Sequence, residues 1–273
     1  MLGRPIIPKE HGAWAVLYGS FLAGIGVAGQ VTLPVALLFV AVTAAALGNG
    51  PLTILVRPAA GRAWEAERRR AWFWLSLYGT PFILSTLPLF LIYRLTFLTA
   101  FGLGAGCFLL FRASLVRGRD DRSLPGELVG TAGLSMVGPA AHAVAARTVE
   151  PTAALLWLLL FLFFASGVFY VRMRIRGMLA RRQGVAPERQ AAFWSCLAYH
   201  LALLVGMPLL AAIHLVPWTI LLAFAPALWR AAAGLRRHQA RLDLKGLGWS
   251  EVAQTLAFLV LLIASLRLPA PPG

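Results

Sequence analysis

The sequence predicts an all-α, polytopic transmembrane helix bundle of about nine spans. Three observations lead to this prediction: the composition is strongly apolar, apolar stretches of spanning length recur along the chain, and basic residues gather in alternate connections. Of the 273 residues, 59% are hydrophobic and 13% are charged, and the mean hydropathy is +0.76. A soluble domain carries about 45–50% apolar and about 25% charged residues. The excess apolar surface therefore has to face lipid.

The nine spans are read from the length of the apolar stretches. A transmembrane helix needs roughly 20 mostly apolar residues. The segments that meet or approach this length are 12–29, 32–56, 71–93, 95–111, 126–146, 151–171, 191–212, 214–229 and 249–267. We expect the second to be broken around Gly48–Pro51 and the fifth to kink at Gly138 and Pro139, because glycine and proline interrupt helices. The chain, residues 1–273, is interpreted as a single transmembrane domain.

The basic residues predict how the spans are oriented. The chain has 25 Lys and Arg against 10 Asp and Glu, a formal charge of +15 that would suggest nucleic-acid binding in a soluble protein. All the basic residues except Arg94, Arg147 and Arg267 precede the first span or follow an even-numbered one. Those after the eighth span are Arg230, Arg236, Arg237, Arg241 and Lys245. Positively charged loops resist translocation, so this side is predicted to be cytoplasmic. We expect a cytoplasmic-membrane protein with its N-terminus inside, its C-terminus outside and no nucleic-acid partner.

A weak internal repeat relates two of the spans. Segment 67–78, which leads into the third span, shares Glu, Arg, Ala, two aromatic residues and Tyr with segment 188–199, which leads into the seventh. The similarity indicates either a duplication or the convergence of basic and aromatic residues that are common at membrane edges. A duplication implies two four-helix units plus a ninth helix.

The first candidate site residues are Lys9, Glu10 and His11, directly before the first span. Ionisable groups at membrane depth are costly, so each is a candidate for function. Three of them together exceed what a helix cap requires. Histidine exchanges protons near neutral pH, which makes His11 the candidate acid or base, with Glu10 orienting it and Lys9 binding substrate.

The remaining candidates lie at the same predicted membrane level. Asn49 is in the second span, Glu127 opens the fifth, and Arg172 and Arg176 close the sixth on one helical face. Glu127 is a candidate catalytic residue, and the other three are candidate substrate-binding residues. The alternative is structural: a carboxylate in a first turn, such as Glu127 or Glu251, complements the helix dipole, and arginines at span ends anchor topology.

Metal and redox chemistry find no support in the sequence. HExxH, P-loop, GxSxG and CxxC motifs are absent. Cys107 and Cys196 stand alone within their spans and are interpreted as packing residues. His142 and His200 are each isolated and are likewise expected to pack rather than to bind a ligand.

The motif Pro8-Lys9-Glu10-His11-Gly12-Ala13-Trp14-Ala15 resembles the N-terminal signature of the YwiC-like family of bacterial membrane proteins. The resemblance continues at Gly126-Glu127, Gly138-Pro139-Ala140-Ala141 and Phe169-Tyr170-Val171-Arg172, and it covers essentially the whole chain. It implies membership of that family but brings no established activity with it.

The predicted architecture is also similar to that of the UbiA-type intramembrane prenyltransferases. Those enzymes place aspartate-rich Mg²⁺–diphosphate motifs after spans two and six. Here Asn49 and the segment 51–57 occupy the first of these places and Arg172, Arg174 and Arg176 the second, without aspartate. Mg²⁺ has no oxygen cage without carboxylates and is not predicted as a cofactor, whereas arginines can bind a phosphate directly.

Three hypotheses follow for the function. The favoured one is a UbiA-like lipid- or prenyl-group transferase with a cytoplasm-facing cavity for an anionic lipid or isoprenoid. The second is a non-catalytic lipid or small-molecule carrier that uses the same cavity. The third is an accessory subunit of a membrane complex, which would be a closed bundle.

Overall fold

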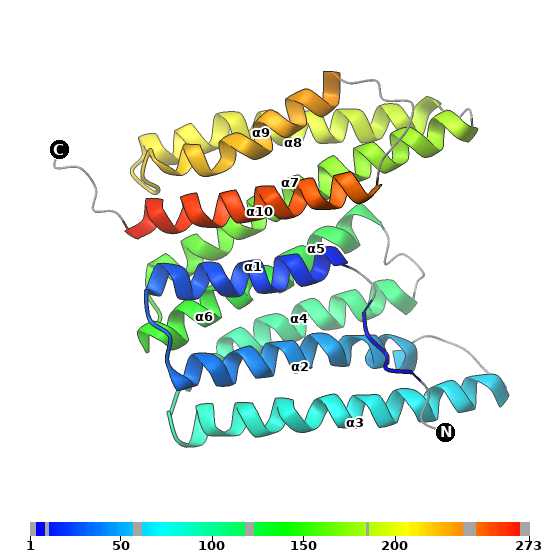
Figure 1. Cartoon of the computed structure of the whole chain (residues 1–273), viewed down its shortest axis with the longest axis vertical. Helices are drawn as coiled ribbons and strands as arrows, with labels where there is room; N and C mark the ends of the chain where they lie inside the picture. Colours follow the sequence, from blue (N-terminus) through cyan, green and yellow to red (C-terminus); the bar gives the residue numbers. More distant parts are fainter. Residues whose placement is uncertain are drawn as a thin grey trace. The chain divides into compact units, whose positions relative to one another are not determined.

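The structure is a computed structural model that describes residues 4–8, 11–56, 62–117, 123–183, 186–236 and 244–267. These residues form α-helices and no strand (Figure 1), which confirms the all-α prediction. The helices are α1 His11–Ala28, α2 Leu33–Val56, α3 Arg62–Leu91, α4 Leu98–Arg117, α5 Leu124–Ser135, α6 Val137–Ala146, α7 Pro151–Gln183, α8 Ala186–Ala212, α9 Ile220–Arg236 and α10 Leu244–Arg267. Since α5 and α6 together occupy one predicted span, these helices correspond to the nine predicted spans.

The helices have the length and surface of membrane-spanning elements. Among the described residues, six helical stretches are long and apolar enough to cross a membrane, and Gly12–Ala28 and Leu98–Phe111 are shorter apolar helices. Large apolar side chains face outward along them, including Leu110 at 74% exposure and Val260 at 67%. Soluble proteins rarely expose so much contiguous apolar surface. The chain is a polytopic membrane protein.

The chain divides into two compact units, residues 1–157 and 158–273. The division falls inside α7, so the first unit contains five predicted spans and the start of the sixth. In the first unit α2 packs against α3, α1 against α6 and α4 against α5. In that unit the C-terminal ends of α2 and α4 lie at the same end as the N-terminal ends of α1, α3 and α5 (Figure 1). The helices of the unit therefore alternate in direction.

Helix α2 corrects one expectation. It runs without interruption from Leu33 to Val56 although it contains Pro51. Pro51 is buried, and the helix continues although proline removes the hydrogen bond to the carbonyl of Leu47. Packing along α3 supports the helix over its length.

The kink predicted in the fifth span is confirmed. Helix α5 ends at Ser135 and α6 begins at Val137, with Met136 between them. Pro139 lacks the N–H that would bond to the carbonyl of Ser135, so the helix breaks one turn before the proline.

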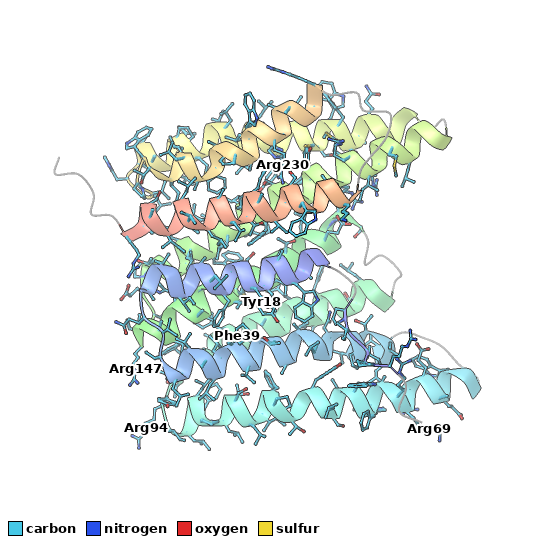
Figure 2. All side chains as sticks on the ribbon, in the orientation of Figure 1. Tyr18, Phe39, Arg69, Arg94, Arg147 and Arg230 are labelled. Atoms are coloured by element: carbon cyan, nitrogen blue, oxygen red, sulfur yellow. The ribbon has the colours of Figure 1, made fainter. Side chains whose placement is uncertain are left out.

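Three residues in tight turns between helices have a left-handed backbone conformation. Arg94, Arg147 and His214 have φ of 54°, 59° and 59°. Arg147 caps α6, and its guanidinium carbon lies 5.8 Å from the centroid of the Tyr93 ring (Figure 2). A cation at a helix C-terminus complements the helix dipole, which explains why this basic residue is an exception to the charge pattern. The turn around His214 also starts α9 at Ile220, later than the predicted 214.

A glycine allows α1 and α6 to approach each other closely. A Cβ atom on Gly24 would meet the carbonyl oxygen of Gly138 and would lie 2.9 Å from the Cβ of Ala141 and 3.0 Å from the backbone nitrogen of His142. Small residues at such crossings are typical of membrane helices, whose association depends on close van der Waals packing.

We therefore expect Gly24→Ala to destabilise the first unit by about 1–3 kcal/mol, because the added methyl overpacks the crossing. The midpoint of thermal unfolding in detergent measures this effect. Gly206→Ala on α8 is the matched control, since a Cβ there meets nothing within 4 Å. Equal midpoints for the two variants would show that the crossing is not tight.

Candidate functional site

A cavity of about 170 Å³ lies within the first unit. Its wall consists of residues from α1, α2, α4 and α5 together with Pro8 of the N-terminal segment. The lining residues are Pro8, Ala13, Trp14, Leu17, Val42, Ala45, Ala46, Asn49, Ala105, Phe108, Leu109, Val129, Gly130, Gly133 and Leu134. All are apolar or small except Asn49 and the indole N–H of Trp14. The cavity is therefore suited to hydrocarbon rather than to a charged group.

The N-terminal segment 4–8 forms part of this wall and is held by side chains from three places. The guanidinium of Arg70 donates to the carbonyl of Arg4, and the Tyr78 hydroxyl donates to that of Ile6 at 3.4 Å. The indole of Trp14 donates to the carbonyl of Pro8 at 3.3 Å. These bonds use the backbone carbonyls of an extended segment, and they hold Pro8 against the cavity.

An aromatic contact fixes the position of Trp14. Its ring stacks on Tyr18 with the centroids 5.6 Å apart, and Tyr18 lies 5.6 Å from Phe39 of α2 (Figure 2). The Tyr18 hydroxyl is also 3.4 Å from the hydroxyl of Thr43. The stacking contact of its ring and the hydrogen bond of its N–H together fix the position of Trp14. This part of the cavity wall is therefore formed before any ligand binds.

The predicted site residues of the first unit fall into two groups. Lys9 and Glu10 lie outside the described residues, and so does the side chain of His11, whose backbone begins α1. Asn49 lines the cavity. Glu127 lies half-buried in the first turn of α5 and is not among the lining residues.

The other two predicted site residues belong to the second unit. Arg172 and Arg176 lie on α7, and both are half-buried. A common site with Glu127 of the first unit stays a prediction. The N-terminus of α5 is capped by Ser123, whose hydroxyl accepts a hydrogen bond from the N–H of Gly126 at 3.3 Å.

The second unit contains a buried ion pair that the sequence reasoning missed. The guanidinium of Arg230 on α9 donates through Nη1 to the carboxylate of Glu251 on α10. Arg230 is only 6% exposed. Its guanidinium carbon lies 4.5 Å from the centroid of the Tyr170 ring, a cation–π arrangement. The Tyr170 hydroxyl in turn accepts a hydrogen bond from Arg174 at 3.1 Å.

Two glycines make room for this cluster. A Cβ on Gly234 would lie 2.5 Å from the ring carbon Cε2 of Tyr170, and one on Gly167 would lie 3.1 Å from Glu251 Oε2. Because these glycines have no side chain, the Tyr170 ring can pack against α9 and the Glu251 carboxylate can pack against α7. The cluster of Tyr170, Arg174, Arg230 and Glu251 is called the Arg230 cluster below.

A signal for this cluster was present in the sequence. Arg230 lies on α9 one turn from Ala227 and Gly234, which share its helix face and are both buried. An arginine on the small-residue face of a helix is expected to point inward. Counting Arg230 only as a topology residue was therefore wrong.

The two isolated histidines are both buried, and one ring nitrogen of each, Nδ1 of His142 and Nε2 of His200, has no hydrogen-bond partner among the described residues. His142 is 4% exposed and His200 is 5% exposed. Nδ1 of His200 lies 2.8 Å from the carbonyl of Cys196, one turn earlier on α8. Within the described ranges, no group of three or more His, Cys, Asp or Glu could hold a metal ion.

The ion pair yields a prediction about stability. Arg230→Met leaves the carboxylate of Glu251 without its partner in a largely buried place, and we expect it to cost about 3–5 kcal/mol. The double variant Arg230→Met/Glu251→Met removes both charges and should retain an unfolding midpoint near that of the parent protein. Thermal unfolding in detergent measures both. A double variant as unstable as the single one would show that the loss comes from packing rather than from the unpaired charge.

Comparison with known proteins agrees with the resemblance in the sequence. Residues 7–142 match the family described as YwiC-like protein. The chain is 27% identical over 231 residues to "Uncharacterized protein YwiC" of Bacillus subtilis (strain 168), an alignment that covers 84% of this chain and 85% of the relative. No solved structure matches. The match includes α1, α2 and the residues around the first-unit cavity, and the chain belongs to the YwiC-like family.

Proposed function

We propose that the protein is a lipid-modifying, transferase-type membrane protein that binds the apolar tail of an anionic amphiphile in the first-unit cavity. The observation that carries the proposal is the cavity wall, which is apolar except for the amide of Asn49 and the indole N–H of Trp14. Ligand pockets of this kind use apolar walls for affinity and a few polar groups for orientation.

The size of the cavity limits what it encloses. An apolar cavity of about 150 Å³ stays dry and holds a molecule the size of benzene. The cavity here, about 170 Å³, is therefore suited to a short piece of an isoprenoid or acyl chain. The rest of such a chain would extend into the surrounding lipid.

The reacting head group is placed, in this proposal, beside Lys9, Glu10 and His11. In the sequence these three residues stand between two residues that line the cavity, Pro8 and Ala13. His11 would act as acid or base, with Glu10 and Glu127 orienting it. Lys9 and Asn49 would bind the anionic head group on the cytoplasmic side, and a head-group role for Arg172 and Arg176 of the second unit stays a prediction.

A non-catalytic lipid carrier is the second candidate, and one observation favours it. None of the residues that line the cavity is an acid, a base or a nucleophile. The same cavity disfavours the accessory-subunit hypothesis, which expected a closed bundle.

The first prediction concerns occupancy of the cavity. Ala105→Phe fills it and should reduce the amount of co-purifying lipid seen by native mass spectrometry at least about fivefold, since the added ring displaces the tail. Ala100→Phe is the matched control, because Ala100 is exposed on the same helix. If both variants keep the same lipid, the cavity is not the binding site.

The second prediction separates the enzyme from the carrier. Purified protein is incubated with prenyl diphosphates, with and without Mg²⁺, and turnover is measured. His11→Ala should lower turnover by about 10²–10⁴-fold, the usual contribution of a general acid or base. His214→Ala, in the turn before α9 of the second unit, should leave it unchanged. If His11→Ala keeps full turnover, His11 is not the acid or base. If the parent protein binds lipid but shows no turnover, the carrier function is favoured.

A further inference from the structure

The guanidinium of Arg230 is only half used by the chain. Its Nη1 donates to Glu251, whereas Nε and Nη2 are buried and have no hydrogen-bond partner among the described residues. An unsatisfied buried donor on a charged group costs several kcal/mol relative to a paired one. From this geometry we infer that the free edge of Arg230 is a phosphate-binding site in the second unit, independent of the first-unit cavity.

The chemistry of the free edge matches an oxyanion. The N–H of Nε and one N–H of Nη2 point in the same direction and form a fork of two parallel donors. Such a fork binds two oxygens of a phosphate group at once. Because Glu251 is bound to Nη1, the phosphate and the carboxylate use different donors of the same guanidinium.

The rest of the cluster holds the fork in place. The guanidinium carbon of Arg230 lies 4.5 Å from the centroid of the Tyr170 ring. Tyr170 is itself only 5% exposed. Arg174 adds a second positive charge, with its guanidinium carbon 5.9 Å from the same centroid.

Two exposed tryptophans indicate that this phosphate belongs to a lipid. Trp229 directly precedes Arg230 and is 77% exposed, and Trp249, two residues before Glu251, is 67% exposed. Tryptophan concentrates where lipid head groups meet the hydrocarbon. The Arg230 cluster therefore lies along α9 and α10 at the depth where phospholipids carry their phosphates. A free phosphate has the same oxyanion chemistry and is the other source to be distinguished.

The test uses the full chain purified in detergent. Binding of short-chain phosphatidylglycerol, of the matching diacylglycerol without phosphate, and of inorganic phosphate is measured by native mass spectrometry with titration. We expect phosphatidylglycerol to bind at least about tenfold tighter than diacylglycerol, because only it offers the oxyanion. Arg230→Met/Glu251→Met, which leaves no unpaired buried charge, should abolish this preference.

Two further variants keep the result interpretable. Arg230→Lys retains the charge but not the fork, and it should weaken phosphatidylglycerol binding at least about threefold. Arg236→Met removes one positive charge from an exposed position of the same helix and should bind within about twofold of the parent protein. Unfolding midpoints measured without lipid identify any variant that fails to fold. If the double variant fails to fold, phosphatidylglycerol binding by Arg230→Lys tests the proposal instead.

The outcomes separate cleanly. Loss of the preference in the Arg230 variants supports the site. Absence of competition by inorganic phosphate then assigns it to a lipid head group, and full competition assigns it to free phosphate. Equal binding of diacylglycerol and phosphatidylglycerol, unchanged binding in the Arg230 variants, or an equal loss in Arg236→Met overturns the proposal.

Discussion

The hydrocarbon core of a membrane offers no hydrogen-bond partner, so the chain has to satisfy its polar groups by itself. This constraint explains why the described residues form helices and no strand. It also explains the hydroxyl side chains inside the helices, which donate to carbonyls one turn earlier. Ser85 donates to Pro81 at 2.7 Å, and Ser166 donates to Phe163 at 2.6 Å. Polar side chains are thus tolerated in the spans because the helix backbone accepts their hydrogen bonds.

The same constraint changes what holds the helices together. Lipid is as apolar as leucine, so helices associate through close packing rather than through burial from water. In the second unit the rings of Phe163 and Phe258 stack with centroids 3.8 Å apart and planes 5° apart, and Phe224 packs edge-on against Phe258. In the first unit Gly24 brings backbone against backbone. Close packing of this kind leaves small voids only where small residues meet, as Ala45, Ala46 and Ala105 do at the first-unit cavity.

Features that depend on neighbouring residues in the sequence could be predicted, whereas features that depend on contacts between helices could not. The approximate positions of the spans follow from local apolarity, and the break at Met136 lies close to the kink predicted at Pro139. Several helix ends were missed, since α3 begins at Arg62 rather than at 71 and α7 ends at Gln183 rather than at 171. The continuous helix through Pro51 could not be predicted, because support from α3 is a tertiary effect. Likewise, the sequence marks Asn49 as polar in a span, but only the packing of α1, α2, α4 and α5 places it in a cavity.

Arg230 shows why charge counting alone is insufficient in a membrane protein. By number it is one more basic residue near a span end, yet it is buried against Tyr170 whereas Arg236, on the same helix, is exposed. Packing does not require a charge at that position, since apolar residues of similar volume often replace buried ion pairs without loss of stability. Glu251 neutralises the charge but uses only one of the guanidinium nitrogens. A buried cation with a partner for its charge and none for its remaining donors is better matched to a ligand than to a purely structural role.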